Sequence, residues 1–148
     1  MLTRLLGYAG AIALISTTTA CVLSSSPETG SDSMTESQEA RSAYSEVPLP
    51  AEAQRFGADP EQIALDAFGL EEPGEGNFTQ VVTTVEQIPT MATVILTQTG
   101  LLDDSVEGMR YWLEFAAEED AWKMVWVGRQ VRCYPNRGSQ DWAIELCS

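Results

Sequence analysis

The reactive side chains of this 148-residue chain are three cysteines, 22 carboxylates and eight basic groups, and there is no histidine. The lack of histidine excludes Ser-His-Asp triads, Cys-His pairs and HExxH zinc sites. Two carboxylates could serve a glycosidase, but no pair among the 22 acids stands out. A Ser-Lys pair would need Lys123, the sole lysine, which lies on a strand face expected to meet water. We therefore expect no enzymatic activity and no catalytic residues.

Motifs for cofactors, metals and nucleic acid are also missing. The sequence has no GxGxxG and no GxxxxGK[ST], so nucleotide binding has no motif support. Asp103, Asp104 and Glu107 share an acidic turn whose spacing does not match an EF-hand loop. We expect these acids to form a solvated turn, and a weak divalent-cation site is the alternative. The net charge of −14 argues against nucleic acid as a partner, because phosphate binding needs a basic surface. We predict no cofactor and no metal site.

A basic and aromatic stretch near the C-terminus is the strongest candidate for recognition. All four tryptophans follow residue 111, and no acid occurs between Ala121 and Gln140. In one interpretation the rings form core and the arginines pair with carboxylates. In a second, the stretch recognises a protein partner, since Trp, Tyr and Arg dominate binding hot spots. In a third, forked guanidinium groups grip a small anion or sugar. The candidate binding patch consists of Trp126, Arg129, Arg132, Arg137 and Trp142.

The first 20 residues have the layout of a secretory signal peptide. Arg4 gives a positive start, an apolar run covers residues 5–15, and small polar residues lead to Ala20 and Cys21. The run is too short to cross a bilayer, which needs about 20 apolar residues. A buried N-terminal helix is the alternative, but the segment that follows is too polar to pack on it. We predict that residues 1–20 direct export.

The segment Thr18-Thr19-Ala20-Cys21 resembles the lipobox of bacterial lipoproteins, with Thr18 where that family usually has leucine. The resemblance implies that Cys21 becomes the mature N-terminus and carries a diacylglyceryl thioether and an N-acyl group. More than one acyl chain is what stable anchoring requires. Ordinary signal peptidase would also accept Thr18 and Ala20, and would release a soluble protein. The expected location is a membrane surface facing the periplasm or the cell exterior, with the bilayer and a membrane or envelope protein as partners.

Residues 21–50 differ in composition from the rest of the chain. They contain eight serines and three prolines, and their few large apolar residues show no period. Such a stretch cannot bury enough surface to offset its ordering entropy. Coil statistics give it a reach of roughly 30 Å. We predict a disordered tether that holds a single domain, residues 51–148, clear of the lipid headgroups.

Cys133 and Cys147 lie 14 residues apart in the sequence of this domain. Cysteines of an exported protein usually form disulfides, and a loop of this size stabilises the fold by about 3 kcal/mol. Two reduced thiols, or a metal pair without its other ligands, are the alternatives, and the signal peptide argues against both. We predict a Cys133–Cys147 disulfide, which leaves Cys21 for the lipid.

One helix followed by a series of strands is expected within the domain. Asp59 can cap a helix that begins at Pro60, Gln62 completes a capping box, and Gly69 closes the helix. Alternating apolar residues then predict strands over residues 78–88, 91–99, 109–116, 122–131 and 142–147. This order indicates an α+β fold. We expect an antiparallel sheet of four or five strands with one N-terminal helix packed on a face, as in cystatin-like and NTF2-like rolls.

Several blocks of the domain resemble a family of exported cyanobacterial proteins of uncharacterised function. The blocks are residues 57–65, 72–78, 97–108, 126–133 and 140–142, with Cys147. The resemblance implies export and a single domain, and it carries over no catalytic residue.

These features predict a membrane-anchored lipoprotein that acts as a non-enzymatic accessory or interaction module of the bacterial envelope. A lipid anchor would raise the effective concentration of the domain at a membrane-bound partner. The alternative is a domain that binds a small anion or sugar in a pocket between the sheet and the helix.

Overall fold

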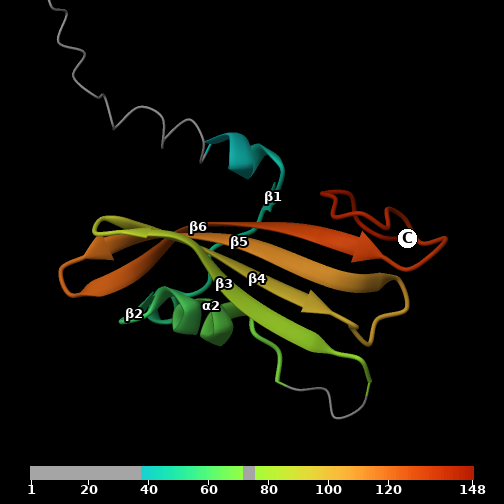
Figure 1. Ribbon diagram of the computed structural model, residues 1–148, viewed down its shortest axis with the longest axis horizontal. Coiled ribbons are helices and arrows are strands. Elements are labelled where there is room, and N and C mark those ends of the chain that lie inside the picture. The colour runs from blue at the N-terminus through green and yellow to red at the C-terminus, as the bar shows by residue number, and fades with distance from the viewer. Residues whose placement is uncertain (1–37, 72–75) are drawn as a thin grey trace, which may run out of the picture.

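The computed structural model describes residues 38–71 and 76–148, and one antiparallel sheet dominates it (Figure 1). The strand order is β1-β6-β5-β4-β3, and β2 also pairs with β6. The strands are β1 (Ser45–Glu46), β2 (Phe56–Gly57), β3 (Thr79–Ile88), β4 (Met91–Thr99), β5 (Val106–Glu118) and β6 (Ala121–Cys133). The predicted export signal, Cys21 and the first part of the predicted tether lie outside the described residues.

The α+β class is confirmed, but the expected number of strands and helices is wrong. The sheet has six strands rather than four or five, because the two-residue strands β1 and β2 add to β6. The single expected helix is joined by a short 3-10 helix, η1 (Glu52–Gln54), which precedes α2 (Pro60–Phe68). Elements of two or three residues are too short to show a period in the sequence, so patterning could not predict them.

Helix α2 forms where the sequence predicts it. The Asp59 carboxylate accepts hydrogen bonds from the backbone N–H groups of Glu61 and Gln62, at 2.8 and 3.4 Å, and Pro60 occupies the first turn. The expected reciprocal half of the capping box is replaced, since the Gln62 side chain donates to Asp66 at 2.8 Å. A Cβ at Gly69 would collide with the Leu65 carbonyl, which explains why glycine ends the helix.

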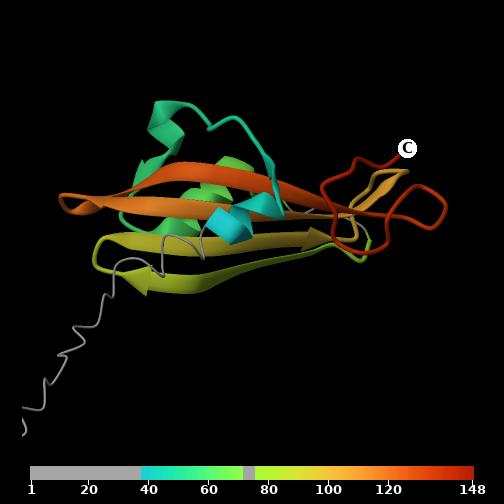
Figure 2. The same cartoon turned by 90° about the horizontal axis from the view of Figure 1, so that it is seen from above.

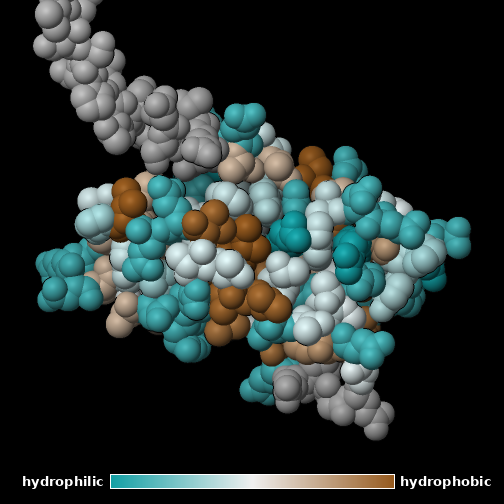
Figure 3. Space-filling view, in the orientation of Figure 1, coloured by the Kyte–Doolittle hydropathy of each residue, from teal (hydrophilic) through white to brown (hydrophobic). Residues whose placement is uncertain are grey.

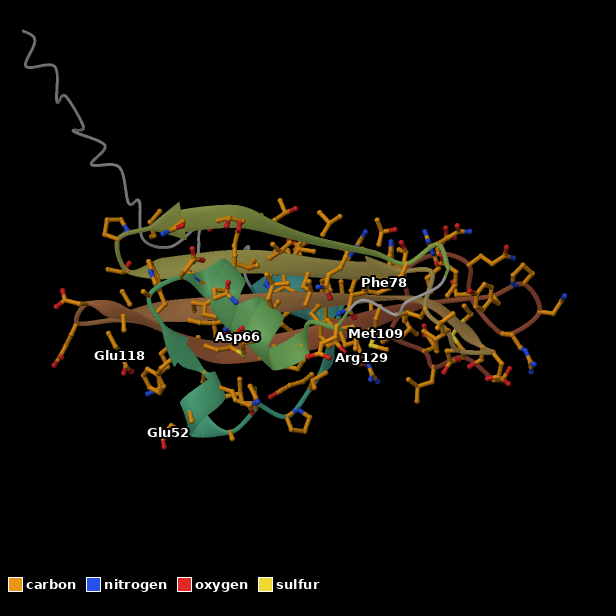
Figure 4. The ribbon with its side chains drawn as sticks, turned by 90° about the horizontal axis from the view of Figure 1, so that it is seen from below. Glu52, Asp66, Phe78, Met109, Glu118 and Arg129 are labelled. Atoms are coloured by element: carbon orange, nitrogen blue, oxygen red, sulfur yellow. A yellow bond between two sulfur atoms is a disulfide. The ribbon has the colours of Figure 1, made fainter. Side chains whose placement is uncertain are left out.

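Helix α2 lies across one face of the sheet, where it contacts β3, β4 and β6 (Figure 4). Alternate residues of the long strands point toward it, as the period of two predicts, except where bulges shift the register of β3 and β6. The buried side chains of this interface are Ile63, Ala64, Ala92, Val94, Leu96, Leu113, Phe115, Met124 and Val127. Each of the largest, Phe115, Leu96, Leu113 and Met124, is at most 1% exposed. The helix and the sheet therefore enclose a filled apolar core.

The folded unit begins before residue 51. Residues 38–42 form a helical turn, and Ser45 and Glu46 pair with Arg129 and Gly128 of β6. The Val47 N–H donates to the Val127 carbonyl at 3.0 Å. Figure 2 shows this segment lying over the sheet. Residues 38–47, here called the strap, were predicted as tether, and their contacts move the start of the domain toward the N-terminus.

The predicted disulfide is present, and it explains why the predicted last strand is absent. The S–S distance between Cys133 and Cys147 is 2.00 Å, and their Cα atoms are 5.6 Å apart. Ala143 pairs with Val131, but an antiparallel strand continuing from there would carry Cys147 away from Cys133. The disulfide instead holds Cys147 at the end of β6, so residues 142–147 curl back after a single bridge (Figures 1 and 2).

Candidate functional site

The face of the sheet opposite α2 carries the concentration of arginine and aromatic side chains. We call it the open face. On β5, Leu113 and Phe115 point into the core, so Arg110, Trp112 and Glu114 point to the open face. Cross-strand pairing places Gln130, Gly128 and Trp126 of β6 beside these three residues in turn. The strap and the C-terminal loop, residues 134–148, add further side chains to the same face.

Glu114 lies at the centre of the open face and is 4% exposed. Its carboxylate accepts hydrogen bonds from the Arg41 guanidinium, with Nε 3.0 Å from Oε1 and 3.1 Å from Oε2, and from the Trp112 indole at 3.1 Å. The Arg41 Cζ atom also lies 5.1 Å from the centre of the Trp126 ring. The hydrogen bond with Glu114 raises the pKa of Arg41, so this cation stays charged at every physiological pH. Arg41 thereby fixes the strap to the sheet.

Tyr44 of the strap lies on the sheet beside Trp112, with ring centres 5.7 Å apart. A Cβ at Gly128 would stand 2.6 Å from the Tyr44 Cβ and would also overlap the Trp126 ring. Glycine at this position therefore lets both aromatic side chains approach the strand backbone. Burial raises the pKa of Tyr44, and the nearby charge of Arg110 acts in the opposite direction.

Trp142 of the C-terminal loop lies between two arginines of the open face. The Cζ atoms of Arg110 and Arg132 are 4.3 and 5.1 Å from the centre of its ring. Gly108 of β5 lies beneath, and a Cβ there would stand 3.0 Å from the ring. Arg132 also pairs with Glu107, and this hydrogen bond raises the pKa of Arg132.

These contacts link the side chains into one continuous row across the open face. We call it the open-face row. Its members in order are Trp126, Arg41, Glu114, Trp112, Tyr44, Arg110, Trp142 and Arg132, and Arg110 joins the two halves as the same-face neighbour of Trp112 on β5.

The structure divides the five residues of the predicted binding patch. Trp126, Arg132 and Trp142 belong to the open-face row. Arg129 pairs across the sheet with Tyr111, on the face that carries α2 (Figure 4). Arg137 lies in the C-terminal loop, 4.0 Å from Asp104, and its side chain donates to the Ser148 carbonyl. The patch is therefore not one surface, although three of its members share one.

Sequence reasoning missed the other five members of the row. Arg41 and Tyr44 lie in a serine-rich stretch that looks like tether, and nothing local indicates that they return to the sheet. Arg110, Trp112 and Glu114 alternate with core residues of β5. This alternation could have predicted that the three side chains share one face of the sheet. It could not show that a buried acid would meet an arginine 73 residues away.

Arg55, Arg110 and Arg129 form no ion pair with any carboxylate of the described residues, in contrast to Arg41, Lys123, Arg132 and Arg137. Of these three, Arg110 lies on the open face, and Arg55 shares with it a buried Nε atom without a hydrogen-bond partner within the same part of the chain. The chain has many carboxylates, so an arginine that pairs with none of those described can bind a carboxylate of another molecule. Arg110 offers this charge on the open face.

A shallow, open hollow of about 610 Å³ lies at the β5–β6 hairpin, and its lining residues are Phe56, Glu118, Glu119 and Ala121. None of the predicted patch residues lines it. The space between α2 and the sheet is occupied by the buried side chains of the core.

The acidic turn after β4 is held by hydrogen bonds within the chain. The Asp103 carboxylate accepts from the backbone N–H groups of Ser105 and Val106, both at 2.7 Å, and from the Ser105 hydroxyl at 2.9 Å. Within residues 38–71 and 76–148, no group of three or more acidic or cysteine side chains is placed to hold a metal ion. No helix in this part of the chain is long and apolar enough to span a membrane.

This turn predicts one acid-sensitive contribution to stability. The hydrogen bonds from Val106 and Ser105 lower the pKa of Asp103 below its ordinary value of 3.8. A lowered pKa stabilises the folded state above the ordinary value, and this contribution is lost as the pH falls through the lowered pKa. The advantage of wild type over Asp103→Asn in urea denaturation should therefore shrink as the pH falls below 3.8. Asp104→Asn, with a side chain 91% exposed, is the matched control. Parallel pH profiles for wild type and Asp103→Asn would contradict the assignment.

Comparison of the chain with protein-family models, curated proteins and solved structures gives no match.

Proposed function

We propose that this protein is a lipid-anchored, non-enzymatic interaction module of the bacterial envelope, and that it binds a membrane or envelope protein through the open-face row. The observation that carries the proposal is the position of the arginines and tryptophans of the open-face row. They extend over the outer surface of the sheet, while the space between sheet and helix is filled. A filled interior supports recognition by a surface rather than in a pocket.

The composition of the row suits a protein partner. Trp, Tyr and Arg are the residues most enriched at binding hot spots, and they supply seven of the eight members. Stacking and ion pairs already hold the side chains in place, so binding would cost little side-chain entropy. Arg110 adds a charge without a carboxylate among the described residues, which favours an acidic group on the partner.

The alternative of a small-anion or sugar site between helix and sheet loses support. A cystatin-like or NTF2-like roll would need a cavity under α2 to bind a ligand there. Phe115 and Leu113 fill that position and are 1% and 0% exposed. Arg132, which would have to point into such a cavity, lies on the opposite face with Trp142.

The lipid anchor at Cys21 is part of the proposal and rests on the sequence. The strap is consistent with a lipid anchor, because Arg41 fixes the N-terminal side of the domain to the open face. An anchored protein would meet its partner at a raised effective concentration, so a weak interface would suffice.

The open face offers a matched pair of variants. Arg110 and Arg129 lie on the neighbouring strands β5 and β6, both are partly buried, and they lie on opposite faces of the sheet. Neither pairs with a carboxylate among the described residues. The change Arg110→Gln removes the open-face charge that has no carboxylate among the described residues, and Arg129→Gln removes an equal charge from the other face.

Chemical crosslinking in the native membrane, followed by capture of the tagged chain, tests the proposal. Arg110→Gln should lower the yield of the crosslinked partner by roughly tenfold, as expected for the loss of one charged contact at a hot spot. Arg129→Gln should leave the yield near that of wild type. Equal yields for both variants would contradict the open-face site. A fatty-acid label on wild type that is absent from Cys21→Ala tests the anchor separately, and an unlabelled wild type would end that part of the proposal.

A further inference from the structure

Strand β3 is the one long strand at an edge of the described sheet. It covers Thr79–Ile88, pairs with β4 on one side, and has no strand on the other. The opposite edge is different, because β6 is covered there by β1 and β2. An uncovered edge presents backbone N–H and C=O groups that can pair with another strand. The β3 edge is therefore the place where this sheet can be extended.

The amino-acid composition of β3 is typical of a strand that pairs with neighbouring strands. Val, Thr and Ile supply most of the strand, and these residues have high β-propensity. Val81 and Val85 are 54% and 51% exposed, although both are apolar. Figure 3 shows apolar side chains gathered over the middle of the strands and polar side chains toward both ends. Protected edges usually carry charges, proline or a bulge, and β3 has a bulge and one charge, Glu86, only in its last part. Residues 79–84 have none of these devices.

Charge favours a second copy of the same chain as the occupant. The chain has a net charge of −14, so two copies repel each other over most of their surfaces. Residues 76–102 contain a single charged side chain, Glu86, so the β3–β4 hairpin is the least charged part of the domain. It is the surface on which two such acidic copies can meet with the smallest repulsion.

The β-bulge at Val85 determines which residues can pair. The ladder between β3 and β4 is regular from Thr79 to Thr84 and shifts before Glu86. Opposite residues of an antiparallel pair point to the same face, so the twofold axis must pass beside a residue. An axis at Val81 sets Val81 opposite its own copy, and the residues paired around it have only Gln, Val and Thr side chains. The same axis keeps the Glu86 side chains of the two copies at opposite ends of the contact. The segment is thus self-complementary.

We propose that two copies of this protein pair edge to edge through residues 79–83 of β3, about an axis at Val81, and form one continuous antiparallel sheet. A twofold axis perpendicular to the sheet leaves both open faces on the same side. The dimer would then present two open-face rows to one partner surface, which adds avidity to the interaction proposed above. The pairing itself does not depend on that interaction. A pairing of about five residues from each copy buries less than the roughly 1,200 Å² typical of stable interfaces, so the dimer should be weak and concentration-dependent.

Charge-swap variants of Val81 test the pairing in the chain as a bacterial host processes it, purified in detergent. Sedimentation velocity over a concentration series should show a monomer–dimer equilibrium for wild type. Val81→Lys and Val81→Glu should each raise the dissociation constant by roughly tenfold or more, because like charges meet at the axis. An equimolar mixture of the two variants should recover the dimer, which also shows that both fold.

The matched controls are Leu146→Lys and Leu146→Glu, in the C-terminal loop, where the side chain is 71% exposed. They change the net charge by the same amount, so they measure the general effect of charge on association. Val81→Lys lowers the net negative charge and would strengthen association if the contact lay elsewhere. A monomeric wild type at all concentrations would overturn the proposal, as would Val81 variants that dimerise like their Leu146 controls.

Discussion

Replacing Arg41 by alanine should lower the free energy of unfolding by about 2 kcal/mol, although residue 41 lies in a segment whose sequence looks like a linker. The substitution leaves the Glu114 carboxylate, whose side chain is 6% exposed, without its cation. The Trp112 indole would then be the remaining hydrogen-bond donor to it among the contacts described. A buried carboxylate without its partner costs several kcal/mol, but the Arg41 side chain is 41% exposed, and water reduces the loss.

A second substitution separates this charge effect from lost packing. In the Arg41→Ala background, Glu114→Gln should recover about 1 kcal/mol, because a neutral amide is less costly to bury than a carboxylate. Lys123→Ala is the surface control. It breaks the ion pair with Glu118, whose side chain is 47% exposed, and should cost no more than about 1 kcal/mol. Urea denaturation followed by far-ultraviolet circular dichroism gives all four values. If Glu114→Gln destabilises the Arg41→Ala chain further, the ion pair is not what holds the strap.

Arg41 also shows where prediction from sequence reaches its limit. Helix α2 and the four long strands follow from local patterns, since a capping aspartate, a proline at the first turn and a period of two act over a few residues. Strand β4 agrees with its predicted bounds to the residue. The strap depends on contacts between residues 41 and 114, and no local pattern records such a pair. Low hydrophobicity alone therefore misassigned a segment that one buried ion pair can order.

In the candidate site, too, local patterns predict some positions, and long-range contacts determine the others. Trp126, Arg132 and Trp142 were predicted as a group from composition, and β6 together with the C-terminal loop brings them to one face. Arg129 was grouped with them because it is close in sequence, but the pleat turns it to the other face. Counting parity along β6 would have separated Arg129 from Trp126 and Arg132 without any structure. The position of Trp142 could not be counted in this way, because it depends on how the disulfide folds the C-terminal loop back.

The disulfide therefore has two roles that one experiment can measure. Reduction of Cys133–Cys147 should lower the free energy of unfolding by about 3 kcal/mol, the value expected for a loop of 14 residues. It should also loosen Trp142 from Arg110 and Arg132, since Trp142 lies inside the closed loop. Comparing oxidised and reduced wild type keeps both sulfur atoms and changes the crosslink alone. Guanidinium denaturation with and without dithiothreitol gives the first value, and tryptophan fluorescence of the folded chain reports the second.

A variant pair then assigns the fluorescence change to Trp142. In Trp142→Phe, reduction should still cost about 3 kcal/mol, because the loop closes as before, but the change in tryptophan fluorescence on reduction should be largely lost. In Cys133→Ala/Cys147→Ala, the oxidised and reduced conditions should coincide in both measurements. The Cys133 side chain is 3% exposed, so this double variant also loses packing and should be less stable than reduced wild type. Equal stability of oxidised and reduced wild type would contradict the first value. Unchanged tryptophan fluorescence on reduction would mean that the two arginines hold Trp142 without the crosslink.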